Sequence, residues 1–284
     1  MNKIKEKMLL SALKVLPKNQ LSWTFGQLAS VKFPKPINQL IIRKFADFYK
    51  INLRELEQPI TAYESLNDFF TRKLRKNTRP FSDDKSIIVS PADGEISQFG
   101  EIKNGKLLQV KGKYFTLSSF LKDNEKSKIF KNGKFLTVYL SPQDYHRVHM
   151  PYAGKLMSYN YIKGKLFPVN KLSTDNISEL FSINERVVFY FKDENLGNYA
   201  VIMVGATNVG SISLSFDDFK TNKLLQKPKK VDVTELEFNK VDELGIFNLG
   251  STVVLIFEDD KVEFSDIKVG LKIKLGNSIA KIKK

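Results

Sequence analysis

Residues 252–257 read Thr-Val-Val-Leu-Ile-Phe, an uncharged run that sets the pattern for most of the chain. β-Branched and aromatic residues favour strands, and similar runs follow from residue 87 onward, separated by glycines and Asn-Gly pairs. They are Ile87–Ser90, Phe135–Leu140, Val187–Phe191, Val201–Val204 and Ile212–Phe216. We therefore predict roughly eight to twelve short strands that form a mostly antiparallel β-sandwich or open barrel.

Near the C-terminus, apolar side chains alternate with lysines, which predicts a further strand. The apolar positions are Ile267, Val269, Leu271, Ile273 and Leu275, with Lys268, Lys272 and Lys274 between them. Asn104-Gly105 and Asn132-Gly133 are typical of tight turns, because both residue types tolerate a positive φ angle.

The first 80 residues have a different pattern, in which apolar residues recur at helical spacing. One stripe consists of Ile4, Met8, Ala12 and Leu16, and a second of Ile37, Ile41, Phe45, Phe48 and Tyr49. Pro34 and Pro36 separate the two stripes. The fold class is therefore α+β, with a helical region over residues 1–80 and a β-rich domain over residues 81–284.

Ser65 is the expected N-cap of a third helix in this region, which contains Leu66, Phe69 and Phe70. We expect four cations in its last turn, where they suit the helix dipole. These cations are Arg72, Lys73, Arg75 and Lys76.

The chain is basic, and the excess is concentrated near its start. It has 46 Lys and Arg against 31 Asp and Glu, a net charge of +15, and residues 1–80 hold 16 of these bases but only 6 of the acids. A basic helical region suits a nucleic acid or an anionic membrane surface, and composition does not choose between them. The helices can equally pack into a core, with solvated basic faces. Lys14 interrupts the apolar stretch 8–13 and no cleavage site follows, so we expect neither a spanning helix nor a signal peptide.

Cysteine and histidine counts limit the chemistry. The chain has no cysteine, which excludes thiol catalysis, disulfides and zinc sites built on cysteine. Its two histidines, His146 and His149, both lie in the segment Tyr145–Pro151. Residues three apart share a face of a helix but point to opposite faces of a strand, and this short segment leaves both geometries open.

Two further short motifs carry reactive side chains. Asp93 lies in Pro-Ala-Asp-Gly, residues 91–94, and Ser251 lies in Leu-Gly-Ser-Thr, residues 249–252. Each motif alone is typical of a turn, but Asp93, His149 and Ser251 together supply the carboxylate, imidazole and hydroxyl of a nucleophilic triad. Ser251 lacks a G-x-S-x-G context. Because Gly250 precedes it directly, its hydroxyl can instead attack the peptide bond before it.

These motifs resemble those of the phosphatidylserine decarboxylase proenzymes of the bacterial type, and the resemblance runs in order over nearly the whole chain. The matching segments are 66–72, 91–94, 139–151, 184–187, 204–212 and 249–252. The block Tyr-His-Arg-Val-His-Met-Pro at 145–151 and Leu-Gly-Ser-Thr at 249–252 are specific in combination.

The resemblance implies an enzyme that makes its own cofactor. Ser251 would attack the Gly250 carbonyl, with His149 as base and Asp93 orienting it, and elimination and hydrolysis would leave a pyruvoyl group at residue 251. The products are a β chain, 1–250, and an α chain, 251–284. Removing CO₂ from an amino acid needs an electron sink, which no natural side chain supplies. The pyruvoyl group would provide it through a Schiff base with phosphatidylserine, yielding phosphatidylethanolamine, and we assign His146 to this decarboxylation.

The resemblance also implies the partners and the location. The expected partners are the phosphatidylserine substrate and an anionic membrane surface on the cytoplasmic side. The α and β chains would form one assembly, and whether it dimerises further stays open. We expect no metal and no nucleic acid. Two alternatives remain: a metallohydrolase with Asp93, His146 and His149 as ligands, and a basic binding protein without catalysis. Only the decarboxylase hypothesis predicts a break in the chain.

Overall fold

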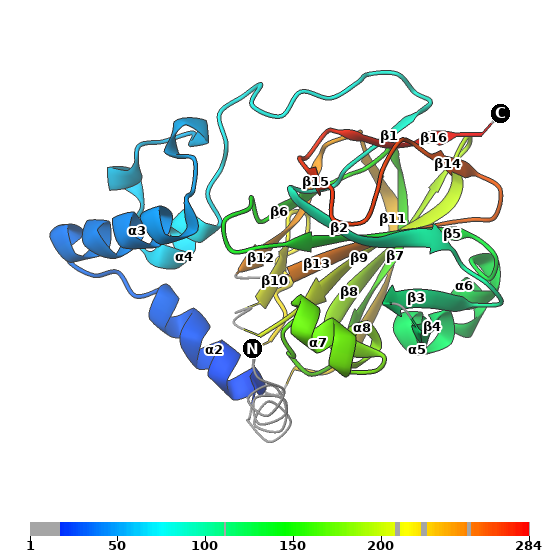
Figure 1. Ribbon diagram of the computed structural model, residues 1–284, viewed down its shortest axis with the longest axis horizontal. Coiled ribbons are helices and arrows are strands. Elements are labelled where there is room, and N and C mark those ends of the chain that lie inside the picture. The colour runs from blue at the N-terminus through cyan, green and yellow to red at the C-terminus, as the bar shows by residue number, and fades with distance from the viewer. Residues whose placement is uncertain (1–17, 111, 208–210, 223–225, 249–250, 284) are drawn as a thin grey trace.

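The computed structural model describes residues 18–110, 112–207, 211–222, 226–248 and 251–283. Helices lie beside a β-rich core in this structure (Figure 1). Those that precede the first strand are α2 (Lys18–Ala29), α3 (Lys35–Tyr49), the 3₁₀ turns η1 (Leu53–Glu55) and η2 (Ile60–Ala62), and α4 (Leu66–Phe70). Those within the β-rich part are α5 (Leu117–Leu121), α6 (Asn124–Ile129), α7 (Lys171–Asn176) and α8 (Leu180–Ile183).

An eight-stranded sheet forms the centre of the molecule. In spatial order its strands are β11 (Lys229–Phe238), β7 (Gly154–Ile162), β8 (Arg186–Asp193), β9 (Gly197–Gly205), β13 (Ser251–Phe257), β5 (Lys134–Leu140), β2 (Gly94–Glu101) and β15 (Lys272–Ile273). Every strand pair of this sheet is antiparallel in the described ranges. The predicted α+β class and the mostly antiparallel core are confirmed.

Smaller sheets accompany the central one. Two have three strands each: β1 (Ile87–Val89), β16 (Ser278–Ile282) and β14 (Val262–Phe264); and β10 (Ser211–Leu214), β12 (Glu243–Asn248) and β6 (Arg147–His149). The hairpin of β3 (Lys106–Val110) and β4 (Lys113–Thr116) forms a further sheet. The six runs predicted as strands correspond to β1, β5, β8, β9, β10 and β13.

Strand β13 is buried on both faces, which explains its uninterrupted apolar sequence. Successive side chains of a strand point to opposite faces. Val253 and Leu255 enter one core, to which the three-stranded sheets contribute, and Val254 and Ile256 enter a second core, to which the β3–β4 hairpin and helices α5 and α8 contribute. A strand covered on both sides needs apolar residues at every position.

The strand predicted from the alternation near the C-terminus is mostly wrong. In the segment 267–275 only β15, Lys272–Ile273, is a strand. Gly270 has a φ angle of 85°, and the chain turns there, with the Leu271 N–H donating to the Lys268 carbonyl at 3.1 Å. Apolar side chains on both sides of this turn, Ile267 and Leu271, pack against the core, so the alternation reflects burial at a turn.

The helices before β1 confirm part of the prediction for residues 1–80. The second stripe forms α3, and the Ser65 hydroxyl caps α4 by accepting the Asp68 N–H at 3.1 Å. The cations expected in the last turn of α4 lie beyond it, because the helix ends at Phe70. The first stripe, residues 4–16, lies outside the described residues.

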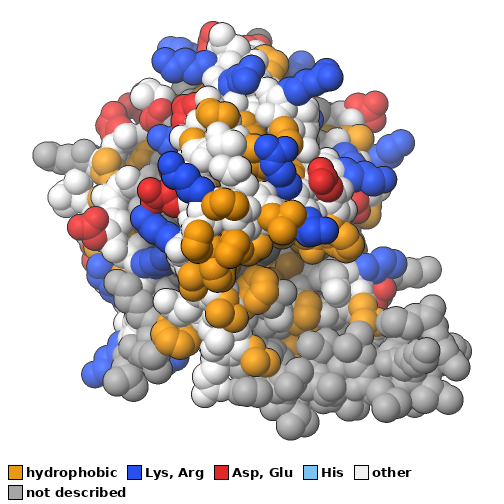
Figure 2. Space-filling model, turned by 90° about the vertical axis from the view of Figure 1, so that its left-hand side faces the viewer, with side chains coloured by type: hydrophobic (Ala, Val, Ile, Leu, Met, Phe, Trp, Pro, Cys, Tyr) orange, Lys and Arg blue, Asp and Glu red, His pale blue; other side chains and the backbone are white. Residues whose placement is uncertain are grey.

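Helices α2 and α3 leave many large apolar side chains exposed. Figure 2 shows hydrophobic side chains gathered on this side of the molecule, with Lys and Arg around them. The exposed large apolar side chains of α2, α3, the link between them and η1 are Leu21, Trp23, Phe25, Leu28, Val31, Phe33, Ile37, Leu40, Phe48 and Leu53, a set that we call the apolar face. No helix in the described part of the chain is long and apolar enough to cross a membrane.

Candidate active site

Ser251 is the first residue of the central strand β13. It pairs with Leu140 at the end of β5 on one side and with Gly205 at the end of β9 on the other. The residue is 1% exposed, and its hydroxyl has no hydrogen-bond partner among the described residues. A buried hydroxyl without a partner is costly, so it marks a position at which a reaction or a ligand is expected.

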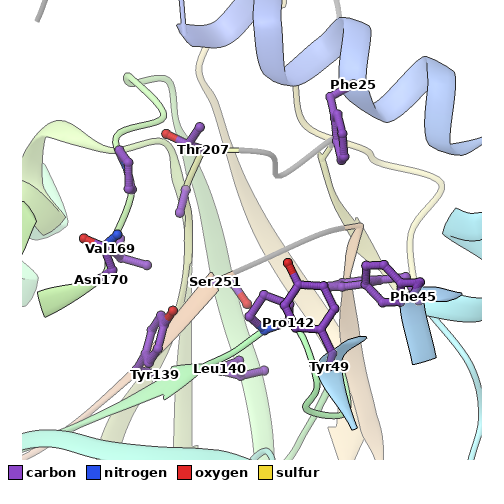
Figure 3. A pocket seen from close by; sticks show the side chains of 13 residues that line it. Phe25, Phe45, Tyr49, Tyr139, Leu140, Pro142, Val169, Asn170, Thr207 and Ser251 are labelled. Atoms are coloured by element: carbon purple, nitrogen blue, oxygen red, sulfur yellow. The ribbon is translucent and has the colours of Figure 1, made fainter. Parts of the chain in front are cut away.

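A cavity of about 330 Å³ adjoins Ser251. Figure 3 shows Phe25 reaching toward it from α2 and Phe45 and Tyr49 from α3, opposite Tyr139 of β5. The remaining lining residues are Phe70, Leu140, Pro142, Pro168, Val169, Asn170, Ala206 and Thr207. The cavity thus lies between the helices and the β core, and its described lining is mainly aromatic and aliphatic.

His146 is fully buried next to this cavity. Its ring lies 4.0 Å, centre to centre, from the ring of Phe70, which lines the cavity. Nδ1 is 2.9 Å from the Asp144 carbonyl oxygen, so Nδ1 carries the hydrogen and Nε2 is the basic atom. Nε2 has no partner in the described part of the chain. Burial, aided by the charge of Arg72, lowers the pKa of His146 to about 3.

His149 is also held as a neutral imidazole, but both of its ring nitrogens are engaged. Nδ1 donates to the Val241 carbonyl at 2.8 Å, and the Tyr145 hydroxyl donates to Nε2 at 3.2 Å. Burial lowers the pKa of His149, while the hydrogen bond to Val241 and the charges of Glu243 and Asp93 act in the opposite direction. The His149 N–H also donates to the Pro91 carbonyl at 2.8 Å, which ties His149 to the segment that contains Asp93.

The Asp93 carboxylate binds a cation instead of a histidine. Oδ1 accepts Nε of Arg79 at 2.9 Å, and Oδ2 accepts Nη2 of Arg79 at 2.6 Å. The Leu275 N–H also donates to Oδ1, at 2.9 Å. The structure therefore brings Asp93 and His149 into one neighbourhood without a hydrogen bond between them.

The register of β6 sets the order of the two histidines along β12. His149 pairs with Glu243 at the start of β12, whereas the Phe247 N–H donates to the His146 carbonyl at 2.9 Å near its end. Residue 248 ends β12, three positions before Ser251. His146 is thus on the Ser251 side of this sheet. Gly250, the other residue of the predicted cleavage site, lies outside the described residues.

The alternative metal site does not form in the described ranges. They contain no group of three or more His, Asp or Glu side chains arranged to hold a metal ion. Asp93, His146 and His149, the ligands of that alternative, are therefore not such a group.

Sequence reasoning missed the arginines that hold this site. Arg72 is 4% exposed and donates from Nη2 to the Gln143 and Asp144 carbonyls at 2.8 and 3.0 Å, so it braces the loop before His146. Arg147 donates to the Thr71 carbonyl at 2.9 Å. Arg72 and Arg79 belong to the basic stretch that suits an anionic surface, yet both point into the protein. The motif Asn-Asp-Phe-Phe-Thr-Arg, residues 67–72, was the available signal for Arg72.

The motif at residues 184–187 supports the other side of Ser251. Asn184 donates from Nδ2 to the Gly205 carbonyl at 2.9 Å and to the Phe167 carbonyl at 2.8 Å. Gly205 is the β9 partner of Ser251. Arg186 is fully buried and donates to four backbone carbonyls, and burial lowers its pKa to about 10. These residues fix backbone segments next to the cavity.

Comparison with known proteins gives one consistent result. A sequence model of the family described as phosphatidylserine decarboxylase matches residues 66–281. A protein of Brevibacillus brevis named phosphatidylserine decarboxylase proenzyme is 39% identical over 279 residues, which cover 97% of this chain and 98% of that protein. Proteins of the same name from Saccharophagus degradans and Francisella philomiragia are 39% and 41% identical, each over 98% of this chain and 99% of the relative. With agreement over almost its entire length, this chain belongs to the phosphatidylserine decarboxylase family of lyases.

Proposed function

We propose that the chain is a proenzyme that cuts itself between Gly250 and Ser251 and then converts phosphatidylserine to phosphatidylethanolamine and CO₂. The observation that carries this proposal is the Ser251 hydroxyl, which is buried, lies beside a cavity and has no partner in the described ranges. The relatives are named proenzymes, which is consistent with processing.

Self-cleavage exchanges the peptide bond for an ester. The Ser251 hydroxyl loses its proton to a base and attacks the Gly250 carbonyl carbon, and the amide nitrogen leaves as a free amine. β-Elimination then frees Gly250 as a carboxyl terminus and leaves dehydroalanine at position 251. Its imine form takes up water and releases ammonia, which gives a pyruvoyl group. The β chain is 1–250 and the α chain 251–284.

We assign the base of this first reaction to His149. Its neutral imidazole can accept a proton at Nε2 once the Tyr145 hydroxyl gives up its hydrogen bond. The carboxylates of Glu243 and Asp93 then stabilise the imidazolium through space, since the charges of both raise the pKa of His149 against the effect of burial. In this arrangement the Val241 carbonyl fixes the orientation of the ring.

The surroundings of Ser251 fit a pyruvoyl group. The side chain that would become the group is small, buried and unpartnered in the described ranges, and it borders a cavity with space for a head group. The pyruvoyl carbonyl supplies a sink for the electron pair that remains when CO₂ leaves. Tyr139, Leu140 and Thr207 would surround the group. Nε2 of His146, whose ring packs on the cavity-lining Phe70, has no partner in the described ranges and would be available for proton transfer.

The cavity is continuous with the apolar face through a shared residue. Phe25 lines the cavity and is 41% exposed. A two-chain lipid is therefore able to keep its acyl chains along α2 and α3 while its head group reaches Ser251. On this basis we propose a peripheral location at an anionic membrane, on the cytoplasmic side.

Mass spectrometry of the intact protein tests the proposal. Wild-type protein should give two chains whose masses add up to that of the precursor plus one water minus one ammonia. Ser251→Ala and His149→Ala should remain single chains. Ser265→Ala is the matched control, because its hydroxyl lies at the surface near that of Ser278, and it should be cleaved. A cleaved Ser251→Ala protein contradicts the proposal.

The same set of variants separates the two histidines. His146→Ala should still be cleaved but should decarboxylate roughly 10²–10⁴-fold more slowly, the usual cost of losing one positioned proton-transfer group. Release of CO₂ from phosphatidylserine in mixed micelles measures this rate. Unchanged turnover of the cleaved variant removes His146 from the site.

A further inference from the structure

The carboxylate of Asp93 is fixed by two segments that are distant from it in the chain. Arg79 contacts both of its oxygens, with Nε at 2.9 Å from Oδ1 and Nη2 at 2.6 Å from Oδ2. The Leu275 N–H, from the future α chain, donates to Oδ1 at 2.9 Å. The side chains of Asp93 and Arg79 are only 9% and 8% exposed. A guanidinium that binds both oxygens sets the position and the plane of a carboxylate.

Arg79 also contacts a second acid, in the helical region. Its Nη2 donates to Oε2 of Glu55 at 2.6 Å, and Glu55 belongs to the turn η1. The other oxygen of Glu55 accepts Nζ of Lys274 at 3.1 Å. Burial alone lowers the pKa of Arg79, but the hydrogen bonds to Asp93 and Glu55 outweigh burial and raise it above its ordinary value.

The charges in this cluster offset one another. Asp93 and Glu55 contribute two negative charges and Arg79 one positive charge, and the side chain of Lys274 is 57% exposed, where solvent screens its charge. Arg72, a second buried cation, also interacts electrostatically with both Asp93 and Glu55. Arg79 fixes the carboxylate, while Glu55 offsets part of the positive charge of Arg79.

We propose that Arg79 and Glu55 are positioning residues for self-cleavage, and that they make cleavage depend on the docking of η1 against the β core. This inference rests on the proposed function, since it takes Asp93 as the acid that stabilises protonated His149. A single hydrogen-bonded cluster around Arg79 joins three parts of the chain: Glu55 of the helical region, Asp93 of the loop before β2, and Lys274 and Leu275 of the C-terminal segment. A chain in which η1 has not yet docked lacks the second partner of Arg79 and holds Asp93 less firmly.

The rate of cleavage in freshly synthesised protein tests this inference. Arg79→Gln should be cleaved about 10- to 100-fold more slowly, which is the usual cost of a misplaced group near a reaction. Arg79→Lys should fall in between, because lysine restores the charge but not the paired contact. Glu55→Gln should slow cleavage by a smaller factor. Lys230→Gln, which removes the exposed pair of Lys230 with Asp123, is the control and should be cleaved normally.

Rescue with a small cation separates positioning from folding. In Arg79→Ala, added guanidinium at non-denaturing concentration should restore part of the cleavage rate, and urea, which is neutral and similar in shape, should not. Absence of rescue in a protein whose circular dichroism matches the wild type overturns the inference. Arg79→Gln and Glu55→Gln chains that mature at the wild-type rate overturn it as well. A wild-type chain that stays intact contradicts the proposed function itself.

Discussion

The environment of His146 makes the folding stability of the protein depend on pH through this one residue. Its imidazole is neutral and fully buried, its pKa is lowered to about 3, and its Nδ1 is tied to the Asp144 carbonyl. In the unfolded chain the same group has an ordinary pKa near 6.5. Between these two pKa values the imidazole is protonated in the unfolded state but not in the folded state. Stability from this group is complete above about pH 6.5 and decreases as the pH falls.

We predict that His146→Asn flattens the acid side of the stability curve. Asparagine keeps an N–H for the Asp144 carbonyl but does not titrate. The comparison uses the Ser251→Ala background, so that every sample is one chain. From pH 6.5 to pH 5 the stability advantage of the protein with His146 over the His146→Asn variant should shrink by up to about 1.4 kcal/mol per pH unit. Urea unfolding at several pH values measures this difference. Parallel curves for the two proteins contradict the assignment of a buried neutral imidazole.

At the scale of elements, α2 and α3 carry apolar side chains that the core does not use. Leu28, Leu40 and Phe48 are 60%, 55% and 78% exposed. Large exposed apolar patches mark surfaces that meet a partner or a membrane. Basic residues that could assist docking have partners within the protein: Arg72 and Arg79 as described, and Arg75, whose Nε donates to the Leu56 carbonyl at 2.8 Å. Apolar contact should therefore contribute more to docking than the charge count suggests.

We predict that replacing Leu28, Leu40 and Phe48 by serine weakens vesicle binding at least tenfold, or by about 1.4 kcal/mol. Co-sedimentation with vesicles of neutral and of anionic lipid measures the binding. Added salt should weaken the anionic component and leave the apolar component. The matched control replaces Tyr114 and Val269, which are 54% and 55% exposed in the β-rich part, and should bind as the wild type does. Equal binding by both variants contradicts a docking role for α2 and α3. Leu9, Leu10 and Leu13, in the apolar stretch 8–13, lie outside the described residues.

The same elements show where sequence reasoning works and where it stops. The runs that became β5, β9 and β13 were predictable because burial on both faces requires apolar residues at every position. Ser65 was predictable as a local cap. The end of α4 was not, because Arg72 leaves the helix to bind carbonyls about 70 positions away in the sequence. Neither the ionic cluster around Asp93 nor the place of Phe25 at the cavity follows from local pattern, since both depend on how α2, η1 and the β core pack.

At the scale of the whole molecule, the proposed cut falls at the start of β13, one of the two middle strands of the eight-stranded sheet. Strand β13 begins at Ser251 and pairs with β5 and β9 along its full length. The α chain would further contribute β14, β15 and β16, so both the central sheet and the sheet that contains β1 would combine strands of the two chains. The proposed cleavage would therefore remove one covalent bond and leave the strand pairs in place.

We predict that cleavage makes stability depend on protein concentration. Unfolding of the processed protein separates two chains, so each tenfold increase in concentration should add about 1.4 kcal/mol to its apparent stability. The urea midpoint of wild-type protein should rise accordingly, and that of the uncut Ser251→Ala protein should not. If the urea midpoint of the processed protein does not change with protein concentration, the two chains do not separate on unfolding and the prediction is wrong.

The position of β13 also means that folding and the proposed cleavage have to occur in a fixed order. The precursor finds its central strand within its own chain, at the high effective concentration that a continuous backbone provides. After the proposed cut, the unfolded β and α chains would have to meet in solution, each with unpaired strand edges that favour aggregation. Under the proposed function, folding therefore has to come before cleavage, and a cleaved molecule that unfolds would no longer have the continuous chain on which it folded. Activity lost by unfolding would then be replaced only by newly synthesised protein.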